Sequence, residues 1–295
     1  MFCNKMRTVQ LKTVYRSTDN DHLLFINRIR EKQPTRKILE EYFAERHWKS
    51  MLTEAVQIGL DMALEHGKPF MWLTSTNKGA SDVCAAALEN QGITETELAQ
   101  GYACDPSSKS ELNILARPGI MVRLTRNFDK QRGFVNGAMG IVVESLRGNE
   151  VFTVKLTGSN NMVLIHPMEE AGRVFLPVCY GYATTIRRAQ GADLFHGCIY
   201  MDQKKRAGRG YGYVATSRFM FRDKCFIYGK LRRTDFLPVG PDQEDEVFER
   251  GYESMDSDLE DHGEYHWGWQ ETTADAEGDL PEYADHDGNE LKDFM

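Results

Sequence analysis

Two short segments in the second half of the chain carry residue types that bind phosphate groups. Residues 182–191 read Y-A-T-T-I-R-R-A-Q-G, and residues 212–218 read G-Y-V-A-T-S-R. The guanidinium group of arginine donates paired hydrogen bonds to phosphate oxygens, and a glycine at a turn lets the backbone approach an anion closely. We therefore expect the arginines of both segments to contact phosphate, and the turn at Gln190 and Gly191 to hold one against the backbone.

An α/β pattern surrounds these two segments. Residues 70–76, FMWLTST, are expected to form a buried strand, followed by a helix over 78–89. The first basic segment is predicted to begin a helix, and beyond it the stretches GCIYMD and KCFIYG have the character of strands, with a helix over YVATSRF between them. Strands that alternate with helices predict a parallel sheet. Helical spacing also runs through residues 20–65, and Gly67 and Pro69 mark where it stops.

Residues 119–166 have a different, all-β character. Four short apolar stretches, IMVRLTR, GIVVESL, VFTVKLT and MVLIHP, are separated by the turn sequences NGAMG, RGNE and GSNN. We expect a small β-module that is inserted between two parts of the α/β core.

The charge is divided between a basic body and an acidic tail. The chain has 36 basic and 44 acidic residues, but the segment from Pro241 onward holds 20 of the acidic and only two of the basic ones, which leaves residues 1–240 with a net charge of +10. A basic body is expected of a nucleic-acid binder, and the basic run KKRAGR at 204–209 is either a further DNA contact or a solvated loop. The tail is expected to be disordered, or else to dock a partner or mimic DNA, with Trp267, Trp269 and Phe294 as aromatic anchors among the charges.

Several classes of protein are excluded at this stage. No apolar run approaches the roughly 18 residues that a membrane helix needs, and residues 1–17 lack the apolar core of a secretory signal. The six cysteines, Cys3, Cys84, Cys104, Cys179, Cys198 and Cys225, form no CxxC or CxxxxC pair, which favours reduced thiols over disulfides or zinc ligands. We expect an intracellular protein without a membrane or metal site, nuclear or cytoplasmic, with the mitochondrion as a further option.

Five segments, in order, resemble motifs of the RecD-like and PIF-type superfamily 1 DNA helicases. Residues 182–191 and 212–218 are similar to motifs V and VI, which in these families read A-x-T-I-H-K-S-Q-G and Y-V-A-L-S-R. Residues 117–142 match G-x-x-V-M-L-x-x-N followed by G-L-V-N-G-x-x-G. Residues 73–77 match a threonine–asparagine motif of the second motor domain, and residues 14–30 resemble the motif IV region. Each match alone is weak, but the ordered set covers roughly three quarters of the chain.

The resemblance implies a role in ATP hydrolysis for particular residues. In these motors ATP lies between two RecA-like halves, and the second half supplies arginines to the γ-phosphate. Arg218 is the first candidate for such an arginine finger and Arg16 is the second, with Gln190 and Gly191 as candidate nucleotide-binding residues. Arginine fingers contribute on the order of 10³–10⁵ in rate in related NTPases. The implied cofactors are ATP and Mg²⁺, which would be bound only together with a first motor domain.

Single-stranded DNA is the implied partner, held by its backbone across both halves. Thr76, Asn77 and Thr185 are the candidates for hydrogen bonds to the DNA, and Arg187 and Arg188 add positive charge. In this family, movement along the strand runs 5′ to 3′, and the implied processes are DNA repair and recombination.

The sequence departs from the family pattern in two ways. Arg187, Arg188 and Ala189 stand where the family has His-Lys-Ser, so we expect DNA affinity to survive better than the coupling of DNA binding to ATP hydrolysis. The phosphate-binding motif G-x-x-x-x-G-K-[ST] is absent, as is an apolar run ending in Asp-Glu before the motif IV region. The chain alone is therefore expected to be inactive as an ATPase. It is predicted to be a truncated helicase, a half completed by a partner chain or domain, or a remnant.

The predicted architecture is a RecA-like parallel α/β core with an inserted small β-barrel, a helical N-terminal segment and a disordered acidic tail. The predicted boundaries are 1–68 for the motif IV region and helical segment, 69–116 and 170–240 for the two parts of the core, 117–169 for the barrel and 241–295 for the tail. The function predicted first is the C-terminal half of an ATP-dependent DNA helicase. The alternatives are a nucleic-acid-binding module without hydrolysis and a protein-interaction fragment that acts through the tail.

Overall fold

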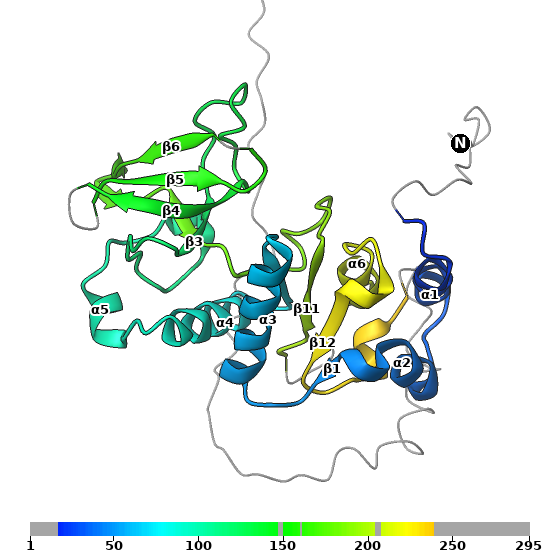
Figure 1. Ribbon diagram of the computed structural model, residues 1–295. Coiled ribbons are helices and arrows are strands. Elements are labelled where there is room, and N and C mark those ends of the chain that lie inside the picture. The colour runs from blue at the N-terminus through cyan, green and yellow to red at the C-terminus, as the bar shows by residue number, and fades with distance from the viewer. Residues whose placement is uncertain (1–16, 147–149, 160, 204–207, 239–295) are drawn as a thin grey trace, which may run out of the picture. The chain divides into compact units, whose positions relative to one another are not determined.

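The parallel sheet that the α/β pattern predicts is present, with five strands in the order β1-β12-β11-β2-β10 (Figure 1). A computed structural model describes residues 17–146, 150–159, 161–203 and 208–238. The strands are β1 (His47–Trp48), β2 (Phe70–Thr74), β10 (Ala183–Thr185), β11 (His196–Tyr200) and β12 (Cys225–Tyr228). Every neighbouring pair runs parallel.

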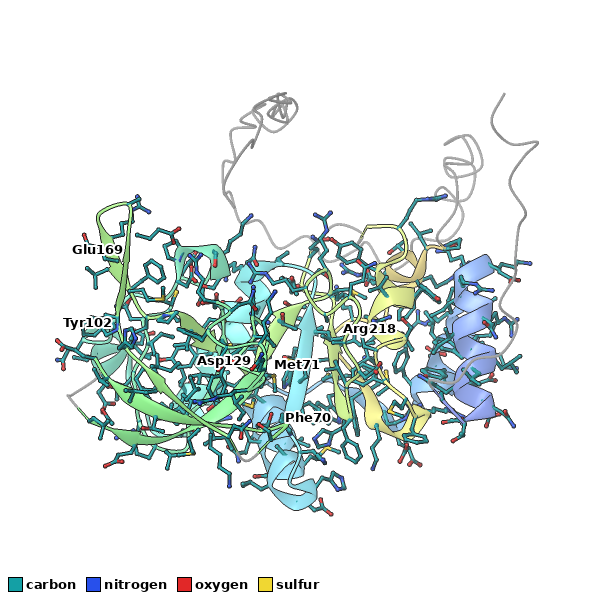
Figure 2. The ribbon with its side chains drawn as sticks, turned by 90° about the horizontal axis from the view of Figure 1, so that it is seen from above. Phe70, Met71, Tyr102, Asp129, Glu169 and Arg218 are labelled. Atoms are coloured by element: carbon teal, nitrogen blue, oxygen red, sulfur yellow. The ribbon has the colours of Figure 1, made fainter. Side chains whose placement is uncertain are left out.

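Helices cover both faces of this sheet. They are α1 (Asn20–Glu31), α2 (Arg36–Phe43), α3 (Leu52–His66), α4 (Asn77–Asn90), α5 (Glu95–Ala99) and α6 (Tyr211–Thr216), and short 3₁₀ turns span Ala44–Arg46, Pro106–Ser108, Arg222–Lys224 and Arg233–Phe236. Successive side chains of a strand point to opposite faces. In β2, Phe70 and Trp72 therefore join one core with α3 and α4, whereas Met71 and Leu73 join a second core with α1, α2 and the segment around α6. Figure 2 labels Phe70 and Met71 on this strand.

The inserted β-module forms a second sheet, which is antiparallel and has the strand order β6-β5-β4-β3-β9. Its strands are β3 (Met121–Leu124), β4 (Met139–Ser145), β5 (Phe152–Leu156), β6 (Met162–Ile165) and β9 (Val178–Tyr180), and a separate hairpin pairs β7 (Met168–Glu170) with β8 (Arg173–Phe175). The burial of β5 alternates between buried and more exposed residues, as expected when one face of a sheet packs against a core. The core of this module is continuous with that under α3 and α4.

The predicted fold class is confirmed: a RecA-like α/β sheet is joined to a separate antiparallel sheet and preceded by helices. Two details differ from the predicted boundaries. The segment 1–68 contributes β1 to the edge of the parallel sheet, and β9, which was placed with the second part of the α/β core, pairs with β3 in the antiparallel sheet. Both strands are only two or three residues long, which is too short for a periodic pattern to reveal them.

The predicted helix after β10 is wrong, because residues 186–191 form a turn and lead directly toward β11. Ala189 donates its N–H to Thr185, but Gly191 has a backbone φ of +90°, which ends helical geometry there. The predicted acidic tail, residues 241–295, lies outside the described residues. No helix in the described part of the chain is long and apolar enough to cross a membrane.

Candidate functional site

The carboxyl ends of three adjacent strands meet at one edge of the parallel sheet. Strand β2 ends at Thr74, β10 ends at Thr185, and Asp202 follows β11 by two residues. This edge is where open parallel sheets bind their ligands, because the loops that leave the strands are free to vary there. The candidate residues from the first basic segment and from the threonine–asparagine motif lie at the ends of these strands or in the loops that follow them.

Asp202 organises the loop that follows β2. Its Oδ1 accepts the backbone N–H groups of Ser75 and Thr76 at 2.8 and 3.1 Å, and its Oδ2 accepts the hydroxyl of Thr76. The same hydroxyl accepts the N–H of Gly79 at 2.9 Å and caps α4. A Cβ at Gly79 would lie 2.4 Å from the Asp202 carboxyl carbon, so only glycine fits. The hydroxyl of Thr76, predicted to contact DNA, is thus engaged in capping α4 and in binding Asp202.

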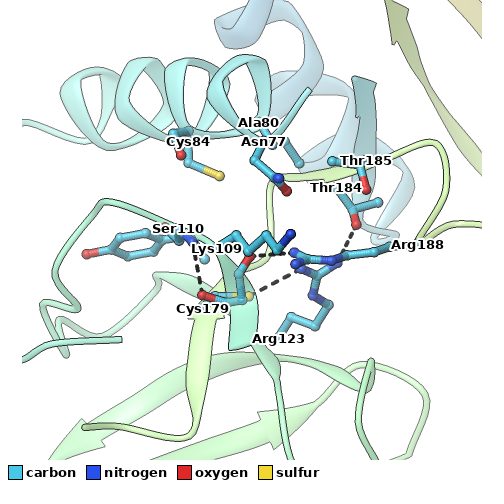
Figure 3. Close-up of a pocket in the computed structure, with 14 residues that line it drawn as sticks. Asn77, Ala80, Cys84, Lys109, Ser110, Arg123, Cys179, Thr184, Thr185 and Arg188 are labelled. Carbon is cyan, nitrogen blue, oxygen red and sulfur yellow. Dashed lines mark hydrogen bonds between the residues drawn. The ribbon is translucent and has the colours of Figure 1, made fainter. Parts of the chain in front are cut away.

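A groove lies beside this loop, between the parallel sheet and the antiparallel module (Figure 3). It encloses about 340 Å³ of space that is open to solvent. Its lining residues are Asn77, Ala80, Ser81, Cys84, Ser108, Lys109, Ser110, Arg123, Cys179, Tyr180, Ala183, Thr184, Thr185 and Arg188. The structure therefore brings together three of the predicted DNA-binding residues, which are Asn77, Thr185 and Arg188.

The lining of the groove is positively charged. It includes Lys109, Arg123 and Arg188, and it includes no aspartate or glutamate. Burial lowers the pKa of the Arg188 guanidinium below its usual value, and the positive charge of Arg123 lowers it further. Like charges held close together without a carboxylate between them favour the binding of an anion.

Hydrogen bonds hold both arginines in place. Arg123 donates to the Thr184 hydroxyl at 2.5 Å and to the Cys179 sulfur at 3.3 Å. Arg188 donates to the carbonyl oxygens of Ser108 and Ser107 at 2.5 and 3.1 Å. Each arginine thus links the parallel sheet to the chain around the antiparallel module, so the spacing of the two positive charges depends on how the two sheets pack.

Sequence reasoning missed Lys109 and Arg123. Arg123 stands in the middle of strand β3 between apolar residues, and a charge interrupting a buried strand was the signal that could have been followed. Lys109 lies in the loop before the module with a backbone φ of +54°, an uncommon conformation for a residue with a side chain. Neither is near the basic segments in sequence, and only tertiary contacts bring them to the groove.

Arg187 lies outside this groove. It is exposed, and its guanidinium carbon sits 5.9 Å from the centre of the Tyr211 ring at the start of α6, within the range of a cation–π contact. The two adjacent arginines that replace His-Lys of the family pattern therefore face different surroundings. The predicted DNA-binding role of Arg187 stays a prediction.

Arg218 lies next to the turn that carries Gln190 and Gly191. Its guanidinium donates to the carbonyl oxygens of Val214 and Ala192 at 3.0 and 3.4 Å, and its own carbonyl accepts the N–H of Leu194 at 2.9 Å. The side chain is largely buried, with 8% of its surface exposed; Figure 2 labels it. The structure thus brings the candidate arginine finger to the candidate nucleotide-binding turn, and the roles of all three stay predictions.

Two further candidates cannot be placed. Arg16, the second candidate arginine finger, and most of the basic run at 204–209 lie outside the described residues. Within the described part of the chain, no group of three or more histidine, cysteine, aspartate or glutamate side chains is arranged to hold a metal ion.

Comparisons with known proteins show which proteins the chain resembles. The fold is a RecA-like α/β sheet with a separate antiparallel module. Among curated proteins, the ATP-dependent DNA helicase PIF1 of Xenopus laevis is 30% identical over 114 residues, and that of Danio rerio is 32% identical over 123 residues. These matches cover 36% and 39% of this chain and 18% and 19% of the relatives. No family model matches.

Solved structures agree on the fold. The Pif1 helicase from Bacteroides in complex with ADP-AlF3 and ssDNA aligns with a TM-score of 0.58 at 19% identity, over 84% of this chain and 57% of that one. Pif1 helicase from Candida albicans aligns with a TM-score of 0.57 at 16% identity, over 84% and 61%. Together with the curated relatives, these matches show that the aligned part of the chain resembles the PIF1-type helicases of superfamily 1. The chain spans just over half the length of these structures and less than a fifth of the curated relatives.

Proposed function

We propose that this chain binds single-stranded DNA in the groove between its two sheets and acts as the second motor domain of an ATP-dependent 5′–3′ DNA helicase. The observation that carries the DNA-binding proposal is the charge of the groove: three cations line it without a carboxylate, beside the carboxyl ends of β2 and β10. Phosphates that pass along such a groove replace their counterions with lysine and arginine side chains.

Two findings support the choice of ligand. The groove also presents the amide of Asn77 and the hydroxyl of Thr185, which can donate hydrogen bonds to phosphate and sugar oxygens. A solved relative, Bacteroides Pif1 bound to ssDNA, shares the fold with a TM-score of 0.56 at 20% identity. Contacts of this kind bind the backbone and not the bases, so binding is expected without strong sequence preference.

The proposed contribution to ATP hydrolysis comes from the turn at Gln190 and Gly191 together with Arg218. These residues would contact the phosphate of an ATP molecule that another segment holds. Another segment is needed because the sequence contains no G-x-x-x-x-G-K-[ST] loop of its own. ATP and Mg²⁺ would then bind only where a first motor domain is present. That same missing motif favours a second candidate function, a module that binds nucleic acid without hydrolysis.

Binding of a fluorescent oligo-dT, measured by anisotropy at several salt concentrations, tests the DNA proposal. Arg123→Ala and Arg188→Ala should each weaken binding about 10-fold, which corresponds to about 1.4 kcal/mol, and each should flatten the salt dependence by about 0.7 per lost phosphate contact. Arg188→Lys keeps the charge and should retain most of the salt dependence. Equal affinity in the wild type and both alanine variants contradicts the groove as the DNA site.

Two further variants sharpen this experiment. Arg28→Ala removes an exposed arginine from α1 and should leave affinity unchanged. Arg187→Ala tests the separate prediction that Arg187 binds DNA. If the affinity for oligo-dT is unchanged in this variant, Arg187 is not a DNA-binding residue. An ATPase assay on the same samples separates the two candidate functions: DNA binding without turnover, even after a first motor domain is supplied, supports the module without hydrolysis.

A further inference from the structure

The outer face of helix α3 combines exposed apolar side chains with carboxylates. Leu64 is 82% exposed and Ile58 is 42% exposed. On the same helix Glu54, Asp61 and Glu65 are exposed, and α3 contains no lysine or arginine. Within the described residues, none of these three carboxylates has an ion-pair partner.

Helices α2 and α4 differ in this respect. In α2, Arg36 pairs with Glu40 and Lys37 with Glu41, and in α4 Lys78 pairs with Asp82. Pairs at this spacing are the usual way in which a solvated helix face balances its charge. The uncompensated carboxylates of α3 are therefore unusual in a body whose net charge is +10.

An apolar pocket adjoins α3 on its inner side. It is a small crevice lined by Val56, Gly59, Leu60, Ala63, Phe70, Trp72, Met121 and Tyr182. Gly59 lets the Phe70 ring pack closely against the helix, because a Cβ there would lie 2.8 Å from that ring. The lining residues Leu60 and Ala63 are themselves only partly buried, so the pocket is not sealed by the helix.

The pocket and the outer face are continuous along the helix. Leu60 lines the pocket, and Leu64 lies one turn further on the same side, since residues four apart are neighbours on a helix surface. Asp61 comes next around the helix, where its carboxylate accepts a hydrogen bond from Gln57 at 2.8 Å. Around the helix, the apolar pocket at Leu60 is thus followed by the exposed apolar side chain of Leu64 and then by the carboxylate of Asp61.

We propose that α3 and this pocket form a docking site for a basic amphipathic helix of a partner protein. One large apolar side chain of that helix packs over the mouth of the pocket, on Leu60 and Ala63. A second packs on Leu64, and flanking lysines or arginines face Asp61, Glu54 and Glu65. Buried apolar anchors surrounded by a polar rim carry most of the affinity in protein interfaces, and complementary charge selects the partner. This site is separate from the proposed DNA groove.

Two other occupants fit the chemistry less well. A nucleic acid would bring its phosphates against the carboxylates of α3, which repel them. A second copy of the chain in a two-fold contact would place the same face against itself, so that the carboxylates of both copies would meet without a cation from α3 between them. The charge therefore favours a basic partner over either alternative.

A pair of synthetic peptides tests the proposal on the full chain. One is an 18-residue helical peptide with leucines at i, i+4 and i+7 and lysine or arginine on the flanks, and its twin carries glutamate in place of each basic residue. By fluorescence anisotropy, the basic peptide should bind at least ~10-fold more tightly than the twin. In the double variant Asp61→Lys/Glu65→Lys, the ratio of the affinities for the basic and the acidic peptide should fall to about one.

Apolar variants and controls complete the test. Leu64→Ser should weaken the basic peptide about 10-fold, whereas Leu24→Ser, on the 71% exposed Leu24 of α1, should not. Oligo-dT affinity should be the same in all of these variants, which separates this result from the DNA proposal. Equal binding of the two peptides, or an effect of Leu24→Ser equal to that of Leu64→Ser, overturns the proposal, and self-association that Leu64→Ser abolishes assigns the face to a second copy instead.

Discussion

The guanidinium group of Arg218, the first candidate arginine finger, already forms several hydrogen bonds within its own domain. Its guanidinium donates hydrogen bonds to Val214 and Ala192 carbonyls and to the Ser217 hydroxyl. These bonds fix the side chain beside Gly191 and reduce the entropy that would be lost on contacting a phosphate. An arginine held in this way suits a role that depends on position and not only on charge.

Replacing Arg218 tests this role when a first motor domain is present. Arg218→Lys keeps the charge but cannot reproduce the fork of hydrogen bonds, so DNA-stimulated ATP turnover should fall by about 10³ or more. The KM for ATP and the affinity for oligo-dT should change much less. A melting temperature measured on the same variant is the control, because a loss of turnover that follows unfolding would show only a structural role.

At the scale of the element, the turn between β2 and α4 depends on one carboxylate. Asp202 accepts three hydrogen bonds from Ser75 and Thr76, and its carboxyl group occupies the space left by Gly79. The start of α4, which carries Asn77 to the groove, is thus positioned by a residue that follows the neighbouring strand β11.

Asp202→Ala should therefore destabilise the protein more than removal of an exposed carboxylate. Loss of an acceptor that serves several partly buried donors costs about 2–3 kcal/mol, which should appear as a lower midpoint of urea denaturation with an unchanged slope. Asp82→Ala is the matched control, because Asp82 forms a surface ion pair with Lys78 that contributes at most about 1 kcal/mol. Equal effects of the two substitutions contradict the proposed role of Asp202.

Across the whole folded unit, two buried histidines connect distant segments. His22 in α1 contacts the hydroxyl of Tyr42 at 2.5 Å and the carbonyl of Phe219, just after Arg218, at 2.9 Å. His196 opens β11 and contacts the carbonyl of Lys68 at 2.9 Å. Burial lowers the pKa of both side chains below the usual value of 6.5, so each is neutral in the folded protein near pH 7.

These shifts predict that stability falls in mild acid. Because the folded pKa values lie below the unfolded value of about 6.5, the unfolded chain takes up protons first as the pH drops. The contribution of these two histidines to the free energy of unfolding should therefore be constant above about pH 7.5 and should decrease as the pH falls below about 6.5. Urea denaturation across that range measures it. His22→Gln should reduce the slope, whereas replacing the exposed His166 with asparagine should not, and a flat profile in the wild type contradicts the prediction.

The sequence was enough to predict the fold class and to name three of the residues that line the groove, which are Asn77, Thr185 and Arg188. Long helices such as α3 and buried strands such as β2 produce periodic patterns, because burial of one face must repeat with the geometry of the element. The ordered motifs around Thr185 and Arg218 predicted the PIF-type helicase resemblance, which the curated relatives confirm over part of the chain.

Only the tertiary structure decided which residues share the groove. Asn77, Arg123 and Arg188 come from three separate segments, and their approach depends on how the antiparallel module packs against the parallel sheet. The same packing directs Arg188 into the groove while Arg187 lies against Tyr211. A sequence pattern reflects the burial of each residue along its own element. Contacts between elements that are distant in the chain depend on how both cores pack, and a local pattern does not contain that information.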